Sequence, residues 1–133
     1  MENKKPIKSF KDLEIYQSSY EAMILIHKEL LSKLPESEKY DLKDQLSRST
    51  KTIPRLIAEG YAKRHQKAGF QKYLDDVMGE CNETVVGIET SRDLYNIDSS
   101  LCSKLITIYD RVGRQTYNLR MVWKNFTSPI SNN

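Results

Sequence analysis

The sequence predicts an all-α fold, an antiparallel up-down-up-down bundle of four helices. Four segments repeat apolar residues in alternating steps of three and four, and no segment of comparable length alternates apolar and polar residues at period two. That spacing is typical of the seam along which antiparallel helices pack. With 133 residues and only 5 Gly and 4 Pro, the chain has the size of one domain and too few turn residues for an all-β fold. We therefore predict a single domain over residues 1–133, with its core at about 10–126 and flexible tails at 1–8 and 127–133.

The first helix is predicted between a capping box and a proline. Residues 9–12, Ser-Phe-Lys-Asp, have the S-x-x-D form in which the two polar side chains satisfy free backbone N–H groups at a helix start. Pro35 ends the helix, because the residue before a proline is pushed out of the α region. The predicted core seam of this helix consists of Leu13, Tyr16, Tyr20, Met23, His27, Leu30 and Leu34.

The second helix contains a proline in its middle. Pro54 lacks an N–H donor and its ring clashes with the Thr50 carbonyl, so we expect a bend or a restart there, with a functional role as the alternative. Gly60 and Gly69 bracket a predicted basic loop at 61–68 that leads to the third helix. The predicted seam of the second helix consists of Leu42, Leu46, Ser49, Ile53, Leu56 and Gly60.

The third and fourth helices are separated by turn and N-cap residues at 96–100, Asn-Ile-Asp-Ser-Ser. Short connections of this kind make consecutive helices antiparallel neighbours. The predicted seam of the third helix consists of Phe70, Leu74, Val77, Cys81, Thr84, Ile88, Ser91 and Tyr95. The predicted seam of the fourth consists of Leu101, Leu105, Ile108, Val112, Gln115, Leu119, Val122 and Phe126.

The residues that usually carry enzyme chemistry do not combine into a recognised pattern. Neither His27 nor His65 follows a glutamate by three residues, as di-iron bundle sites require, so we interpret His27 as a hydrogen-bonded core residue and His65 as part of the basic loop. Cys81 and Cys102 lie too far apart along antiparallel helices to form a disulfide, and we predict free thiols. We therefore predict a protein that is not an enzyme, with no cofactor, no metal site and no small-molecule substrate.

The hydrophobic pattern indicates neither a membrane segment nor a secretion signal. The longest apolar run covers residues 22–26, whereas a membrane span needs about 20 residues. Residues 1–10 contain no apolar stretch of the kind that secretory signals carry. We predict no membrane association and a cytoplasmic location.

The charges are distributed unevenly along the chain although the formal net charge is only +3. Residues 43–72 have a net charge of +6, and residues 73–98 have a net charge of −6. A basic helix and loop can bind phosphates, whereas the alternative is that these charges are solvated or pair with the acidic segment. The candidate phosphate-binding residues are Arg48, Lys51, Arg55, Lys63, Arg64 and Lys67, with Tyr61 available to stack on a base.

Two segments carry more apolar surface than the core of one bundle requires. Residues 22–26 cover every face of a turn in the first helix, and the fourth helix has a second apolar stripe beside its seam. Such faces favour burial against other chains, with a broader core as the alternative. The candidate oligomer-interface residues are Ile24, Leu25, Ile26, Ile106, Tyr109, Tyr117 and Met121.

A resemblance to a known family rests on residues spread from about Phe10 to Leu119. The motifs are Phe10-x-x-Leu13, Leu34-Pro35-x-x-Glu38-x-Tyr40-x-Leu42-x-x-Gln45-Leu46-x-Arg48, Ile53-Pro54-x-x-Ile57-Ala58-Glu59-Gly60, Phe70-x-x-Tyr73-Leu74 and Gly79-x-x-x-Glu83. The chain resembles the four-helix-bundle proteins encoded in 23S rRNA intervening sequences (S23 ribosomal protein-like). It is more distantly similar to the accessory variability proteins of diversity-generating retroelements. Where the family usually has Asn before Ile57 and Ser after Gly79, this chain has Leu56 and Glu80.

The resemblance implies a homopentameric bundle with a basic surface and no catalytic activity. Our leading hypothesis is therefore a non-catalytic oligomeric nucleic-acid-binding protein that binds structured RNA through the basic second helix and loop. The alternative is a protein-interaction scaffold with no nucleic-acid role. Salt-dependent RNA binding distinguishes the two, because phosphate contacts weaken as the salt concentration rises.

Overall fold

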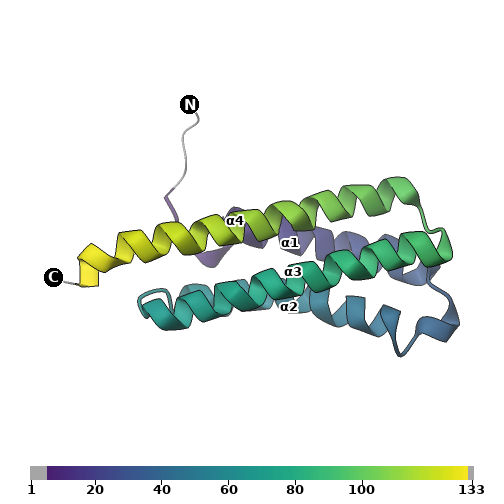
Figure 1. Cartoon of the computed structure of the whole chain (residues 1–133), viewed down its shortest axis with the longest axis horizontal. Coiled ribbons are helices and arrows are strands. Elements are labelled where there is room, and N and C mark those ends of the chain that lie inside the picture. The colour runs from purple at the N-terminus through teal and green to yellow at the C-terminus, as the bar shows by residue number, and fades with distance from the viewer. Residues whose placement is uncertain (1–5, 132–133) are drawn as a thin grey trace.

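The computed structural model describes residues 6–131, with side chains as far as residue 122, and it is a bundle of four long helices (Figure 1). The helices are α1 (Glu14–Leu25), α2 (Leu42–Ala62), α3 (Lys67–Tyr95) and α4 (Ser99–Ser131). Short turns complete the chain: η1 (Phe10–Asp12), a π turn η2 (Ile26–Leu30), η3 (Leu31–Lys33) and η4 (Glu36–Glu38). Consecutive helices are joined at alternating ends of the bundle (Figure 1), and each packs mainly against its two neighbours. The predicted all-α four-helix bundle is confirmed.

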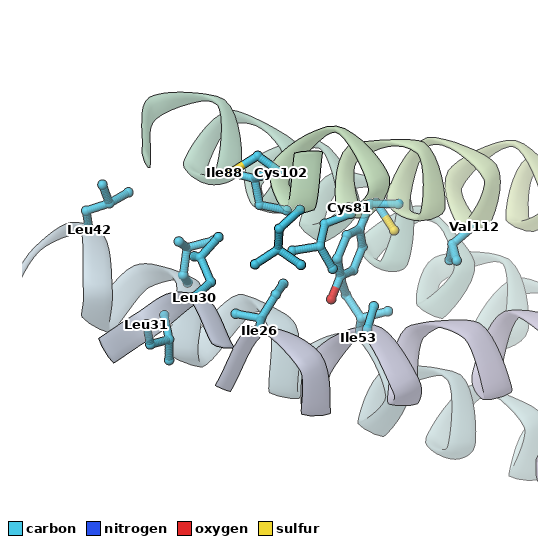
Figure 2. Packing of buried hydrophobic residues seen from close by; sticks show 14 of the residues in the cluster. Ile26, Leu30, Leu31, Leu42, Ile53, Cys81, Ile88, Cys102 and Val112 are labelled. Atoms are coloured by element: carbon cyan, nitrogen blue, oxygen red, sulfur yellow. The ribbon is translucent and has the colours of Figure 1, made fainter. Parts of the chain in front are cut away.

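The predicted seams of α2 and α3 are the faces that the structure buries. From Phe70 to Ser91 every predicted seam residue of α3 is buried, and α2 buries all of its predicted seam except the half-buried Leu56. Ile53 of α2, Ile88 of α3, Val112 of α4 and Ile26 of the first helical segment belong to one apolar core. Figure 2 shows these side chains in the space between the helices. Single apolar stripes of this kind leave only one way to orient a helix toward its neighbours.

The predicted seam of the first helix is only partly correct. Leu30 and Leu34 are buried as predicted. The rest of the buried face consists of Ile15, Ser19, Ala22 and Ile26, whereas the predicted seam residues Tyr16, Tyr20, Met23 and His27 are half-buried or exposed. Ile26 is fully buried, so its assignment to an oligomer interface is also wrong. Small side chains at Ser19 and Ala22 let α1 approach the core closely, whereas the predicted pattern favoured the larger aromatic residues.

The core face of α4 is also rotated from the prediction. Tyr109 is fully buried beside Leu105 and Val112, whereas the predicted seam residue Ile108 is only half-buried. The assignment of Tyr109 to an oligomer interface is therefore wrong. The helix continues to Ser131, through residues 127–131 of the segment predicted as a tail, and residues 132 and 133 lie outside the described residues.

The predicted helix ends are partly confirmed. The Ser9 capping box is present, but it caps the short turn η1 rather than α1 itself. Leu34 is extended before Pro35, and Asp98 accepts the Leu101 N–H at the start of α4, as predicted. The basic loop is shorter than predicted, because α2 runs to Ala62 and α3 begins at Lys67. Pro54 does not end α2, which continues as one helix on both sides of it.

Close contacts between α2 and α3 explain two of the small residues in their interface. A Cβ atom added at Gly60 would lie 2.8 Å from the Cβ of Tyr73, so only glycine fits there. Deeper in the same interface, the Ser49 and Thr84 hydroxyls form a buried hydrogen bond of 2.8 Å.

Within the described residues no helix is long and apolar enough to span a membrane. Cys81 and Cys102 are both buried free thiols, as predicted.

Candidate nucleic-acid interface

Three cations follow one exposed face of α2, which we call the α2 ridge: Arg48, Lys51 and Arg55. Steps of three and four residues bring side chains to the same face of a helix. Arg48 forms an ion pair of 3.1 Å with Asp44 one turn earlier, and Arg55 donates from Nη2 to the Thr52 hydroxyl at 3.2 Å. The core seam of α2 lies on the opposite face, so the ridge points to solvent along the middle of the bundle.

A second group of cations surrounds the connection between α2 and α3, and we call it the turn cluster: Lys63, Arg64 and Lys67. Arg64 is held in place, because its Nη1 donates to the Tyr61 carbonyl at 2.8 Å and its guanidinium lies 4.0 Å from the Tyr61 ring centroid. Tyr61 is therefore not an open stacking platform as predicted, since Arg64 covers one face of its ring. Lys63 and Lys67 are exposed, with the Lys63 ammonium 5.9 Å from the Tyr73 ring.

Three carboxylates of α3 form ion pairs, all with cations outside the α2 ridge and the turn cluster. Asp75 pairs with Arg120 of α4 at 2.6 Å, Asp76 with Lys72 at 3.2 Å, and Asp93 with Arg92 at 2.8 Å. Among residues 6–122, no carboxylate lies within ion-pairing distance of the four cations Lys51, Arg55, Lys63 and Lys67. Pairing with the acidic segment, the alternative interpretation of the basic charge, is not observed for these four side chains.

One carboxylate of α3 does lie in the field of the α2 ridge. Burial, together with the nearby charges of Glu83 and Asp76, raises the pKa of Glu80, and the positive charge of Arg48 acts against this rise. Lys51 in turn contributes to the lowered pKa of His27 in the first helical segment. The charges of the α2 ridge therefore act on both neighbouring helical segments.

Structure adds two groups that the charge count along the sequence missed. The first is Lys8 and Lys11, because η1 packs against α2 and residues Ile7 and Leu13 share a cavity of about 200 Å³ with Tyr61 and Arg64. These two exposed lysines therefore lie at the same end of the bundle as the turn cluster. The charge count along the sequence missed these two lysines, because residues 1–42 as a whole have a net charge of −1.

The second group is a row of three aromatic side chains, which we call the aromatic row: Phe10, Tyr16 and Tyr20. The rings of Phe10 and Tyr16 meet edge to face with centroids 4.9 Å apart, and those of Tyr16 and Tyr20 stack at 5.7 Å. Tyr20, at the end of the row, is 44% exposed. The wrong assignment of Tyr16 and Tyr20 to the core seam concealed this surface.

His27 joins α1 to α2 beside the α2 ridge. Its Nε2 lies 3.2 Å from the Thr50 hydroxyl, and that hydroxyl donates to the Leu46 carbonyl, so it accepts from the Nε2–H of a neutral imidazole. Burial and the charge of Lys51 lower the pKa of His27, and a backbone hydrogen bond at Ser47 opposes them. A hydrogen-bonded histidine in this place agrees with the structural role predicted for it.

A groove of about 310 Å³ runs between α1 and α4 on the other side of α1. Ile24, Leu25 and Ile108 give it an apolar floor, and three cations at its edges, Lys28, Lys104 and Arg111, have no ion-pair partner among residues 6–122. The remaining interface candidates lie on α4, where Ile106 is half-buried, Tyr117 is 52% exposed and Met121 is 36% exposed. Tyr117 lines a separate groove of about 480 Å³ between α3 and α4.

The chemistry offered by these surfaces is recognition of charge and of flat rings. No three His, Cys, Asp or Glu side chains come together as a metal site in the part of the chain that the structure describes. Burial raises the pKa of the Cys81 thiol to about 12, which keeps this thiol protonated and unreactive at neutral pH. Exposed Lys and Arg side chains bind phosphate, and exposed tyrosine rings stack on bases.

Comparison with known proteins assigns the chain to a family. No curated protein matches it. The family of 23S rRNA-intervening sequence proteins matches it over residues 11–118, which include α1, α2, α3, the α2 ridge and the turn cluster. The match covers most of the 133 residues. This chain therefore belongs to the 23S rRNA-intervening sequence protein family.

Proposed function

We propose that this protein is a non-catalytic oligomeric RNA-binding protein whose α2 ridge and turn cluster contact the phosphates of structured RNA. The observation that carries the proposal is the set of exposed cations Lys51, Arg55, Lys63 and Lys67, which have no carboxylate partner among residues 6–122. The family's link to 23S rRNA intervening sequences supports RNA as the class of ligand. Phosphate contacts supply affinity and orientation without reading sequence.

Oligomerisation would multiply this affinity. We propose that a second copy of the chain occupies the groove between α1 and α4, and that α3 of this second copy docks there. The cations Lys28, Lys104 and Arg111 at the groove complement the net charge of −6 over residues 73–98, where Val86 is exposed next to the acidic side chains. A contact between two different surfaces of identical chains is heterologous and closes into a ring when the rotation permits. The family resemblance favours a ring of five in the cytoplasm, and a ring repeats the basic surface on every subunit.

RNA titration of a charge variant tests the proposal. In Lys51→Gln/Arg55→Gln we expect RNA affinity to fall several-fold, because fewer phosphates are neutralised. The slope of log affinity against log salt should flatten by roughly 0.7 to 0.9 for each phosphate that the variant no longer neutralises. The matched control is Lys33→Gln/Lys39→Gln, which removes the same charge from exposed sites in and next to the connection between η3 and α2.

Two results would count against an RNA-binding function. Wild-type protein that fails to bind RNA at low and at physiological salt overturns it in favour of the scaffold alternative. An equal decrease of affinity in the ridge variant and in the control variant shows that net charge alone attracts RNA and that the α2 ridge is not the binding surface.

A further inference from the structure

We propose that the aromatic row and the α1-facing side of the α2 ridge together form a site for unpaired RNA bases, so that the protein selects single-stranded segments of a structured RNA. This inference rests on the proposed function and narrows its ligand class. The proposed site combines two surfaces that lie about 30 residues or more apart in the sequence. The antiparallel packing of α1 and α2 brings these surfaces side by side.

The register of α1 against α2 places the two surfaces at the same level. His27 Nε2 lies 3.2 Å from Thr50 Oγ1, and at the other end Leu13 shares a cavity with Arg64. In an antiparallel pair, moving seven residues toward the start of α1 corresponds to moving seven residues toward the end of α2. Tyr20 is therefore level with Ile57, within one helical turn of Arg55.

Both surfaces lie on the same side of the bundle. The stripe that contains Tyr16, Tyr20 and His27 faces α2, because His27 contacts Thr50. Lys51 directly follows Thr50, so it lies beside the face of α2 that contacts His27. The groove that we assign to a second copy is lined by Ile24, Leu25 and residues of α4, and none of the three rings of the aromatic row is among its lining residues. The base site and the groove therefore use different side chains.

The aromatic row is arranged to continue a stack. Phe10 supports Tyr16 edge to face, and Tyr16 stacks on Tyr20, so two of the three rings are fixed by their neighbours. Tyr20 ends the row with 44% of its surface exposed. A base stacked on Tyr20 would extend the row by one ring and bring its phosphate within reach of Arg55 or Lys51. Paired bases cannot insert in this way, because their faces are already stacked within a helix.

Stacking differs from phosphate binding in how it responds to salt. Removing the Tyr20 ring should decrease affinity without changing the number of counterions released, so the salt slope should stay as in wild type. Removing a ridge cation should change the slope. This difference separates the base site from the phosphate-binding function on which it rests.

The test compares a single-stranded oligoadenylate of about 12 nucleotides with a fully paired, blunt-ended RNA duplex of equal length. For Tyr20→Ala we expect the affinity for oligoadenylate to decrease by roughly 5- to 150-fold, with no change in the salt slope and unchanged duplex binding. Tyr20→Phe should bind like wild type, and Tyr20→Leu, which keeps an apolar side chain without a ring, should bind like Tyr20→Ala. Tyr40→Ala removes an aromatic ring that is 86% accessible and outside the row, and it should bind like wild type.

Several results would overturn the base site. Equal binding of oligoadenylate by wild type, Tyr20→Ala and Tyr40→Ala refutes stacking on the row, and the proposed function survives if the ridge variant still binds more weakly. Stronger binding of the duplex than of oligoadenylate by wild type refutes selection of unpaired RNA. A change of oligomer mass in Tyr20→Ala, measured by light scattering, assigns the row to an interface between copies instead. If a thermal melt shows that Tyr20→Ala is unfolded, the comparison of Tyr20→Leu with Tyr20→Phe decides.

Discussion

Among individual residues, the polar groups in the interior are hydrogen-bonded with few exceptions. The Ser49 and Thr84 hydroxyls form a hydrogen bond with each other, and the Thr116 hydroxyl donates to the Val112 carbonyl. His27 is hydrogen-bonded to the Thr50 hydroxyl. A buried polar group without a partner costs stability, so these bonds make the polar positions compatible with a packed core. The Tyr109 hydroxyl is an exception, since it is buried without a partner among the described residues.

The first prediction concerns the pH dependence contributed by His27. Its pKa is lowered from the usual value of 6.5, chiefly by burial, so protonation is harder in the folded state than in the unfolded state. The stability linked to His27 is therefore complete above about pH 6.5 and is lost as the pH falls through the lower folded pKa. We expect urea midpoints of the wild type to fall between about pH 7.5 and about pH 5, and the fall to be smaller in His27→Gln.

The control for this prediction is His65→Gln, which changes an exposed histidine in the connection between α2 and α3. Its midpoints should follow those of wild type at both pH values. If His27→Gln shows the same fall in midpoint as wild type, the carboxylates rather than His27 carry the pH dependence.

Among the helices, the packing of α2 against α3 depends on small residues at defined positions. Gly60 lies against the Tyr73 Cβ, and Gly87 lies against Leu46, where an added Cβ would be 2.7 Å from a methyl group. The two cases differ physically, because a leucine methyl can rotate away whereas the tyrosine Cβ moves only with its backbone. The glycine that ends the Ile57-Ala58-Glu59-Gly60 motif thus has a packing role.

The second prediction compares two glycines in helices. Gly60→Ala should lower the free energy of unfolding by about 1–3 kcal/mol, because the added methyl group overpacks the α2–α3 interface. Gly79→Ala should raise it by about 0.5–1 kcal/mol, because nothing lies within 4 Å of the added Cβ and alanine favours the helix. Urea denaturation measures both. A stabilised Gly60→Ala variant would show that α2 and α3 separate more easily than this packing implies.

In the molecule as a whole, three surfaces of the bundle have different chemistry. The side formed by α1 and α2 combines the aromatic row with cations, the groove between α1 and α4 combines apolar residues with cations, and α3 presents carboxylates. Under the proposed function, this separation would let one surface hold RNA while two others hold neighbouring copies. Affinity for RNA would then increase with the number of subunits through avidity.

The third prediction concerns assembly. We expect light scattering to give a mass several times 15.5 kDa for the wild type and a smaller mass for Ile24→Glu, which places a charge on the apolar floor of the α1–α4 groove. Tyr40→Glu, which places the same charge on an 86% exposed side chain outside both the groove and α3, serves as the control. A wild-type mass of 15.5 kDa at micromolar concentration would contradict the proposed oligomer.

The order of residues along the chain was sufficient to predict the fold class, the number of helices and the packing registers of α2 and α3. Each of these two helices has one apolar stripe, so only one orientation buries it, and Ile53, Val77 and Ile88 all lie where their spacing predicts. Capping residues such as Asp98 mark a helix start through local hydrogen bonds, which a sequence pattern also reveals.

The choice of buried stripe in α1 and α4 came instead from tertiary packing. Each carries two apolar stripes roughly 100° apart, since neighbouring residues differ by that angle around a helix, and the choice depends on how closely other helices approach. Packing placed Ile26 and Tyr109 in the core and left Tyr20 on the surface. The same packing folds Arg64 onto Tyr61 and leaves Lys51 without a carboxylate partner among the described residues, because ion pairs and ring contacts depend on distances in space that residue order does not contain.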